Sequence, residues 1–146
     1  MKILFLHGWH SVPGAVKPTY LIDHGYEVIN PILDDDDFDV ATATMLKQGT
    51  LMGIGGHTAS GSVTLYDQNG QKFVVLDPYS SQNGPDLKVY LSKNVNASSY
   101  INLGPLKSIT GMQSYAVPGN PNIAEYPYVH IWCEQFSVEF GRAELQ

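Results

Sequence analysis

The 146-residue sequence predicts a mainly β protein, an antiparallel β-sandwich of jelly-roll-like or barrel-like form, preceded by a strand–helix–strand segment. Two observations support this fold class. Charged residues make up only 15% of the chain, whereas 9 tyrosines, 14 glycines and 9 prolines favour strands and turns over a helical bundle. In addition, from residue 49 onward short apolar stretches recur with turn signals at intervals of about 8–12 residues, a spacing typical of sandwiches and barrels.

Residues 1–40 form the first predicted unit, with a strand, a helix and a second strand. Residues 2–6 (KILFL) contain a continuous apolar run, typical of a strand that is covered on both faces. A proline suited to a first helical turn and a glycine suited to a position after a helix end predict a short helix over about residues 17–24. Residues 26–30 (YEVIN) then form the second strand of a parallel pair.

Residues 41–47 are expected to be a linker, and residues 48–146 a β domain. The clearest local signal is a hairpin. Asn69-Gly70 supplies the positive φ angles of a tight turn. Residues 62–67 before it alternate between apolar and polar side chains, and residues 72–76 after it are mostly apolar. The predicted strands are residues 50–54, 62–67, 72–76, 87–91, 100–103, 113–117, 129–133 and 136–140, with a short final stretch at 143–145.

The C-terminal stretch holds the only cysteine, Cys133, and the densest run of strand-forming residues. The apolar residues before Cys133 share its parity, while His130 and Trp132 lie on the other face of the predicted strand. After Cys133 the apolar parity slips by one residue. Residues 134–135 are therefore predicted to be a bulge or a tight turn, after which the apolar residues of 136–140 face the core.

Charge and composition exclude several function classes. The net charge is −6 and no basic patch occurs, so neither nucleic acid nor an anionic membrane surface is an expected partner. No apolar run approaches membrane-spanning length, so no membrane insertion is expected. The N-terminus lacks the pattern of a signal peptide, which predicts a cytoplasmic location. An exported location stays open if the N-terminal segment is a fusion or a gene-model error.

The segment ILFLHGWHSVPG, followed by YLIDHGYEVINPIL, resembles the start of an alpha/beta-hydrolase of the serine-hydrolase kind, truncated at about residue 40. The resemblance implies that His7 and Gly8 would lie beside an oxyanion hole. However, the sequence contains no G-x-S-x-G motif, so it lacks the nucleophile that such an enzyme needs. No hydrolase activity, and no independent catalysis, is expected.

Residues 48–146 resemble the DM13 domain, a family of electron-transfer domains. The resemblance rests on the blocks GTLMGIGGHTASGSVTLYDQNGQKFVVL, NGPDLKVYLS, YINLGPLKSITGMQSYAVP and YVHIWCEQFSVEFGRAEL. It implies a small β-rich domain in which the characteristic cysteine, here Cys133, acts in redox chemistry. That cysteine would work as a bare thiol or as the ligand of haem or another prosthetic group, and the domain would meet a redox partner protein.

The residues themselves leave two interpretations of Cys133 open. It is the candidate catalytic residue, because a thiolate stabilised by positive charge is a nucleophile and an electron donor. The alternative is a buried cysteine that packs as a small apolar residue. Among its sequence neighbours only His130 could supply positive charge, and Glu134 would oppose it. The lone cysteine allows no internal disulfide, and no Cys/His spacing resembles a zinc site.

Other polar and aromatic residues have weaker signals. His57, in a glycine-rich turn, would cap that turn or act as a metal or haem ligand. Asp86 is expected to accept backbone hydrogen bonds in the loop before a strand. Several tyrosines would form an aromatic path or a binding surface, or merely occupy half-buried strand positions: Tyr79, Tyr90, Tyr115, Tyr126 and Tyr128.

The sequence therefore predicts an accessory electron-transfer β domain with one redox or ligand cysteine. The alternative is a non-catalytic binding or adhesion module. The surroundings of Cys133 discriminate between them: a thiol enclosed by apolar side chains, with no cavity for a prosthetic group, favours the binding module.

Overall fold

The computed structural model describes residues 2–4, 27–29 and 38–146. The chain divides into two compact units, residues 1–37 and residues 38–146. Within the described ranges, no helix has the length and apolar character needed to cross a membrane.

The first unit contains one described pair of strands. Strand β1 (Lys2–Leu4) and strand β2 (Glu27–Ile29) pair in parallel, with Lys2 opposite Glu27. Parallel pairing is what a strand–helix–strand segment requires. The helix expected over residues 17–24, together with His7 and Gly8, lies outside the described residues.

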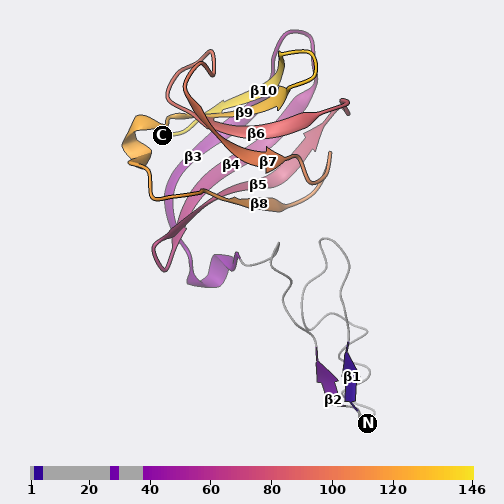
Figure 1. The fold of residues 1–146 in the computed structure, drawn as a ribbon, viewed down its shortest axis with the longest axis vertical. Coiled ribbons are helices and arrows are strands. Elements are labelled where there is room, and N and C mark those ends of the chain that lie inside the picture. Colours follow the sequence, from indigo (N-terminus) through magenta and orange to yellow (C-terminus); the bar gives the residue numbers. More distant parts are fainter. Residues whose placement is uncertain (1, 5–26, 30–37) are drawn as a thin grey trace. The chain divides into compact units, whose positions relative to one another are not determined.

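The second unit is one antiparallel sheet of eight strands that curls into a nearly closed barrel (Figure 1). The strands are β3 (Thr44–Gly53), β4 (Ala59–Gln68), β5 (Gln71–Ser81), β6 (Leu87–Ser92), β7 (Tyr100–Pro105), β8 (Gln113–Ala116), β9 (Tyr128–Cys133) and β10 (Val138–Glu144). Their order in the sheet is β7-β6-β9-β10-β3-β4-β5-β8, and the two edge strands β7 and β8 approach each other. The mainly β, barrel-like fold predicted from the sequence is confirmed.

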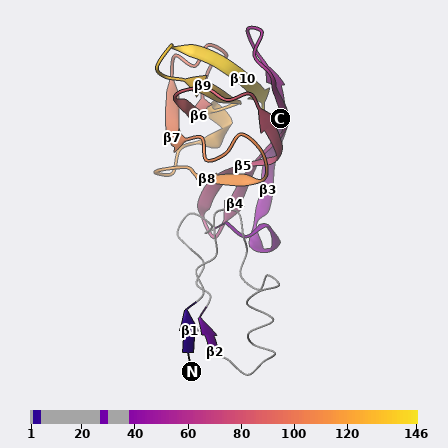
Figure 2. The ribbon, with the colours of Figure 1, turned by 90° about the vertical axis from the view of Figure 1, so that its right-hand side faces the viewer.

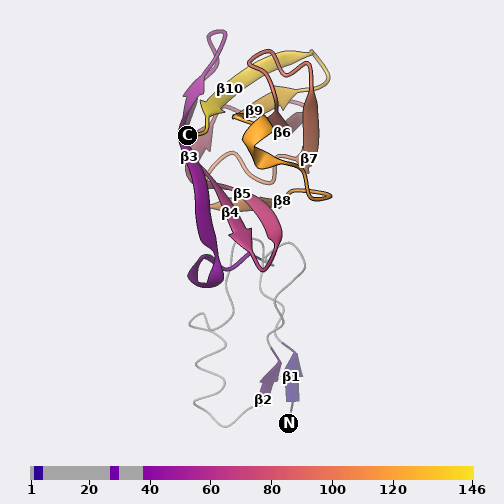
Figure 3. The ribbon, with the colours of Figure 1, turned by 90° about the vertical axis from the view of Figure 1, so that its left-hand side faces the viewer.

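Two short 3-10 helices accompany the barrel, η2 (Val40–Thr42) before β3 and η3 (Ile123–Glu125) between β8 and β9. Seen from the side, the chain end lies beside β3 (Figure 3). There the backbones of Gln48 and Gln146 exchange two hydrogen bonds of 3.0 and 3.1 Å. These bonds extend the pairing of β10 with β3 and help to close the barrel.

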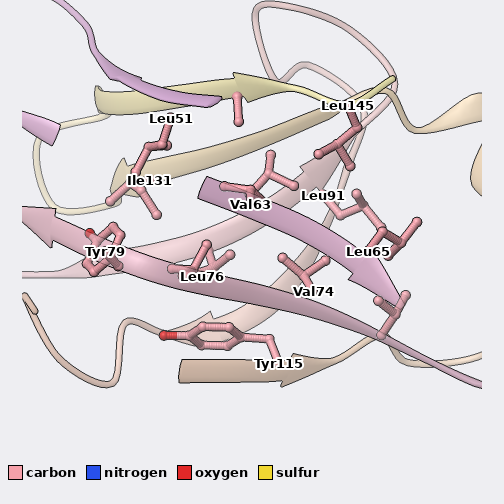
Figure 4. Close-up of a cluster of buried hydrophobic side chains, with 14 of the residues drawn as sticks. Leu51, Val63, Leu65, Val74, Leu76, Tyr79, Leu91, Tyr115, Ile131 and Leu145 are labelled. Atoms are coloured by element: carbon pink, nitrogen blue, oxygen red, sulfur yellow. The ribbon is translucent and has the colours of Figure 1, made fainter. Parts of the chain in front are cut away.

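The barrel is filled by alternate side chains from all its strands except the edge strand β7, whose apolar residues pack less deeply. Figure 4 shows them converging from opposite walls. The largest fully buried side chains of this core are Leu51, Leu65, Leu76, Leu91 and Ile131, with five valines. Burial of this continuous apolar core stabilises the fold, at about 25 cal/mol for each Å² of apolar surface removed from water.

The β4–β5 hairpin forms as predicted. Gln68 pairs with Gln71, and the two residues between them, Asn69 and Gly70, have φ angles of 54° and 86°. The Asp67 carboxylate accepts a hydrogen bond from the Gly70 N–H at 2.9 Å, which further fixes the turn. Strand β3, in contrast, begins at Thr44 and takes in residues that the sequence suggests as a linker, because they pair with the long strand β4.

The C-terminal hairpin corrects one prediction. A turn occupies residues 134–137, so the irregularity expected at 134–135 is confirmed. However, Phe136, expected on the apolar face of a strand over 136–140, lies in that turn and is 64% exposed. Val138 is also exposed, and of these apolar residues only Phe140 enters the core. A bulge between Glu139 and Gly141 restores the inward parity. Figure 2 shows β9 and β10 side by side beyond this turn.

Candidate functional site

Strand β9 carries the candidate cysteine and places its side chains alternately on the two faces of the sheet. Its inward residues, Cys133 among them, are 0% exposed and belong to the hydrophobic core. Trp132 and His130 point to the outer face, as predicted, since His130 contacts Glu139 there and Trp132 stacks near Tyr90. The two faces of β9 therefore form two separate candidate sites.

Cys133 ends β9 and is covered by the neighbouring strands. Its register partners are Leu87 of β6, which is buried with Cys133 in the core, and Val138 of β10, which is exposed. Gly84 and Phe140 pack against Leu87 so closely that a methyl group added at Gly84 would lie 3.0 Å from both side chains. The thiol is thus enclosed by apolar side chains and closed to solvent in this state.

A pocket of about 300 Å³ adjoins this cover, and Leu87 forms part of its wall together with residues 84–86 and 105–109. The loop before β6 is tied down at Asp86, whose backbone oxygen accepts a hydrogen bond from the Glu134 N–H at 3.0 Å. The Asp86 carboxylate, expected to accept backbone hydrogen bonds, instead pairs with the Lys88 ammonium at 2.9 Å.

Haem held by Cys133 does not fit this arrangement. The pocket lies at the lower end of the range of about 300–1,000 Å³ usual for ligand sites, and Cys133 is not among its lining residues. A prosthetic group could reach the sulfur only if the covering side chains moved. Within the described part of the chain, no group of three or more His, Cys, Asp or Glu residues is placed to hold a metal ion.

The contacts of His57 hold the turn in which it lies. Its ring stacks on Phe140 with centroids 3.9 Å apart, and its Nδ1 lies 3.0 Å from the Gln82 side-chain nitrogen. Its backbone N–H donates to Ile54 within the turn. These contacts hold the β3–β4 turn against the end of the barrel that contains Cys133, so they support the turn-capping interpretation over the ligand interpretation.

The outer face of β9 contains a buried polar network around His130. His130 Nδ1 lies 2.6 Å from a Glu139 carboxylate oxygen, and its Nε2 lies 2.7 Å from Ser92 Oγ. Arg142 bridges the other Glu139 oxygen, at 3.3 Å, to the backbone oxygen of Val95, at 3.0 Å. The loop over residues 93–99 thereby covers His130, which explains why a residue on the polar face is 0% exposed.

The contacts of this network resemble the order of a hydrolase triad, serine to histidine to carboxylate. A nucleophile must reach a substrate carbonyl, however, and Ser92 is 0% exposed. Its hydroxyl also lies 2.7 Å from the backbone oxygen of Asn94, to which it can donate. The network therefore fixes the loop to the sheet rather than presenting a nucleophile.

Burial lowers the pKa of His130 below its ordinary value of 6.5, although the hydrogen bond to Glu139 acts in the opposite direction. The ring is accordingly neutral near pH 7. It also lies on the opposite face of the sheet from Cys133. His130 therefore does not supply the positive charge that the sequence suggested for a Cys133 thiolate.

Further along the outer face, three aromatic rings form a row across β7, β6 and β9. Tyr90 stacks on Tyr100, with centroids 4.0 Å apart and planes at 13°, and on Trp132, with centroids 6.0 Å apart and planes at 22°. The Tyr90 hydroxyl donates to the Glu134 carboxylate at 2.6 Å, and Asn102 donates to the same oxygen at 3.0 Å. A pocket of about 320 Å³ lies against this row.

Of the tyrosines suggested as an aromatic path, only Tyr90 joins this row, whereas Tyr79 and Tyr115 belong to the core. Tyr100 and Glu134 were not recognised as site residues. The period-two pattern places Trp132 on the outer face of β9, and Glu134 lies in the turn that follows, but the pairing of β6 with β9 that brings Tyr90 to them is long-range. A local pattern in one strand does not encode that pairing.

Comparison with known proteins agrees with the resemblance found in the sequence. A family model described as Electron transfer DM13 matches residues 52–145, more than half of the chain and nearly all of the barrel. The alpha/beta-hydrolase resemblance of residues 1–40 finds no support in these comparisons. No curated protein and no solved structure matches the chain. The chain therefore belongs to the DM13 family of electron-transfer domains.

Proposed function

We propose that this chain is an accessory electron-transfer domain in which Cys133 acts as a bare redox thiol towards a redox partner protein. Membership of the DM13 family supports the electron-transfer part of this proposal. The observation that carries the role of Cys133 is its place at the end of β9, directly opposite Leu87. Because Leu87 also lines the neighbouring pocket, one side chain belongs both to the cover of the thiol and to the pocket wall.

Access to Cys133 requires the loop before β6 to open. Near its start this loop is held by the hydrogen bonds of Gln82 to Thr58 and His57. Next to β6 it is held by the Glu134 N–H to Asp86, the Asp86–Lys88 ion pair, and the packing of Gly84 on Leu87 and Phe140. Local opening of loops costs less free energy than global unfolding. An opened loop would expose the thiol while the rest of the barrel stays folded.

The chemistry is thiol–disulfide exchange. Cys133 loses its proton to solvent, and the thiolate attacks one sulfur of a disulfide in the partner. A bond forms between Cys133 Sγ and that sulfur, the partner's S–S bond breaks, and its second sulfur leaves as a thiolate. A lone cysteine can complete no cycle within one chain, so the electrons must come from a separate thiol donor. One donor thiol attacks Cys133 Sγ and releases the partner as a dithiol, and a second donor thiol then regenerates Cys133 and leaves as the donor disulfide, so that two electrons pass to the partner.

The second candidate function is a non-catalytic binding module. The observation that favours it is the complete burial of Cys133 among apolar side chains, with 0% of the residue exposed. Under this alternative the thiol packs as a small apolar group, and a partner binds elsewhere on the barrel.

Labelling kinetics separate the two functions. The full chain is mixed with an aromatic disulfide reagent, and the rate of modification of Cys133 is followed at increasing urea below the unfolding transition. Loop opening predicts a rate that hardly depends on urea and exceeds the rate allowed by global unfolding. A rate that follows global unfolding over the whole range supports the binding module and overturns the redox role of Cys133.

Two leucine variants serve as a matched pair. Leu87→Ala removes the side chain opposite Cys133 and should accelerate labelling. Leu106→Ala trims the same pocket at a residue that is not paired with Cys133, so it should leave the rate nearly unchanged. Equally faster labelling in both variants would indicate general destabilisation. Cys133→Ala, which has no thiol, gives the background signal of the reagent.

A further inference from the structure

The phenol of Tyr90 is arranged differently from every other buried phenol in the described part of the chain. Tyr90 is 3% exposed, and its hydroxyl donates to the Glu134 carboxylate at 2.6 Å. Tyr79 and Tyr115, the other buried tyrosines, donate to a serine hydroxyl and to the Gln113 amide oxygen. Tyr90 alone thus combines burial with a short hydrogen bond to a group that can accept a proton.

This environment keeps Tyr90 protonated at rest. Burial raises its pKa well above the ordinary value of 10, and the hydrogen bond to Glu134 acts in the same direction. Removal of the proton alone would leave a buried phenolate beside a carboxylate. Two negative charges 2.6 Å apart repel each other, so this state is costly.

Removal of an electron has the opposite consequence. A phenol that has lost one electron is a strong acid, and its proton has an acceptor 2.6 Å away in Glu134. Transfer of the proton along this bond leaves a neutral radical at Tyr90 and a neutral carboxylic acid at Glu134. Tyr90 is therefore neutral both before and after oxidation. The only charge that changes is that of Glu134, which goes from a carboxylate to a neutral acid.

The neighbouring rings provide a path to the surface. Tyr100 stacks face to face on Tyr90 with centroids 4.0 Å apart and is 46% exposed. Trp132, from the neighbouring strand β9, stacks on Tyr90 with centroids 6.0 Å apart and is half-buried. Parallel rings in contact overlap in their π systems, which favours electron transfer between them. The pocket of about 320 Å³ is lined by all three rings and by Glu134, so a partner can approach the row directly.

We propose that Tyr90 and Glu134 form a proton-coupled redox pair, with Tyr100 and Trp132 as the route by which the electron leaves. The co-reactant is a one-electron oxidant, such as an oxidised metal centre on a partner protein. The oxidant takes one electron from Tyr90, the phenolic proton passes to Glu134, and re-reduction returns the electron and the proton. This proposal rests on the electron-transfer function proposed above but not on Cys133.

The test uses a photogenerated ruthenium(III) polypyridyl complex as the oxidant and electron paramagnetic resonance of the full chain as the readout. We expect the signal of a neutral tyrosyl radical in the wild-type chain and its loss in Tyr90→Phe. Tyr115→Phe is the matched control, because Tyr115 is equally buried at 3% and donates at the same 2.6 Å to an amide that cannot take a proton. It should keep the full signal.

Glu134→Gln tests the proton acceptor while the Tyr90 ring stays in place. Loss of a positioned base should slow radical formation about a hundredfold, the lower end for general base catalysis. The deuterium-solvent effect on the rate should also fall. A radical that survives Tyr90→Phe, disappears in Tyr115→Phe, or forms at the wild-type rate in Glu134→Gln would overturn the proposal.

Cys133→Ala separates this proposal from the role of Cys133. If the tyrosyl radical forms in Cys133→Ala at the wild-type rate, the Tyr90–Glu134 pair works without the thiol. If the radical requires Cys133, the pair is not an independent redox site, and the proposal fails as stated. Failure of thiol labelling leaves the radical experiment unaffected, so the two functions stand or fall separately.

Discussion

His130, which is 0% exposed, and the partly exposed Glu139 lie 2.6 Å apart on the outer face of the sheet. The imidazole spans the network, with Glu139 at Nδ1 and Ser92 at Nε2. The Ser92 hydroxyl donates to the backbone oxygen of Asn94 at 2.7 Å, so the imidazole is held between Glu139 and a hydroxyl that is itself bonded to the loop.

This network predicts a pH-dependent stability. The unfolded chain binds a proton on His130 below the ordinary value of 6.5, whereas burial lowers the pKa of the folded state. The unfolded state therefore binds more protons in this window, and the free energy of unfolding should fall as the pH drops from about 7 to about 5. Urea unfolding at a series of pH values measures this loss.

The matched controls are two glutamine variants. His130→Gln should remove most of the pH dependence between those values, whereas His57→Gln, outside the network, should retain it. Asp67 also has a pKa lowered from its ordinary value of 3.8, chiefly by its hydrogen bond to Lys72, so its titration falls outside this window. An unchanged pH profile in His130→Gln would contradict the assignment.

The sequence predicts the strands well wherever their signals are local. The Asn69-Gly70 turn and the alternation in β9 depend only on neighbouring residues, and both form as expected. The burial of His130 depends on a loop around Val95 that returns over the sheet. Phe136 has strand character, but it follows the end of β9 and lies in the turn to β10. Tertiary context decides both cases.

Gly84→Ala should destabilise the barrel and loosen the cover of Cys133. An added methyl group would lie 3.0 Å from Leu87 and from Phe140, so those side chains must shift. Overpacking of this kind costs about 1–3 kcal/mol. We expect a lower urea midpoint together with faster labelling of Cys133.

A double-mutant cycle checks the cause. Phe140→Leu shortens the side chain that the new methyl group would contact, so it should recover part of the loss in the Gly84→Ala background. Strictly additive effects of the two substitutions would show that the steric contact is not responsible.

Truncation tests where the β domain begins. Deletion of residues 1–37 should leave a cooperative unfolding transition, since residues 38–146 form a compact unit. Deletion of residues 1–43 also removes Phe38, whose ring lies 5.0 Å from Tyr66 and 5.3 Å from Phe73. That shorter chain should fold but lose about 1 kcal/mol, the scale of an aromatic pair. Calorimetry that finds no cooperative transition after the first deletion would contradict the two-unit division.

The candidate site was only partly visible in the sequence. Cys133 stands out because it is unique, and its inward direction follows from the parity of β9. The row of Tyr100, Tyr90 and Trp132 depends on the register of three strands that are distant in sequence. Closure of the barrel sets the register of these strands. The residue pattern of a single strand does not reveal that register.

The last prediction separates the packing of Cys133 from its chemistry. Cys133→Ser places a hydroxyl in the hydrophobic core at a residue that is 0% exposed, and burial of a hydroxyl without a partner costs about 1–3 kcal/mol. Cys133→Ala removes only the sulfur and should cost less. Val129→Thr is the matched control, because it adds a hydroxyl on the same face of β9 at a residue that is also 0% exposed.

Urea unfolding should therefore rank Cys133→Ser and Val129→Thr together as the less stable variants, with Cys133→Ala closer to the wild type. This ranking follows from burial alone and holds for either function of the chain. A redox measurement then decides between the two functions. If Cys133 is a redox thiol, the redox activity is lost equally in Cys133→Ser and Cys133→Ala, whatever the stability of the two variants. A Cys133→Ser variant as stable as Cys133→Ala would show that water or a polar partner reaches this end of the barrel, and the enclosed arrangement around Cys133 would be wrong.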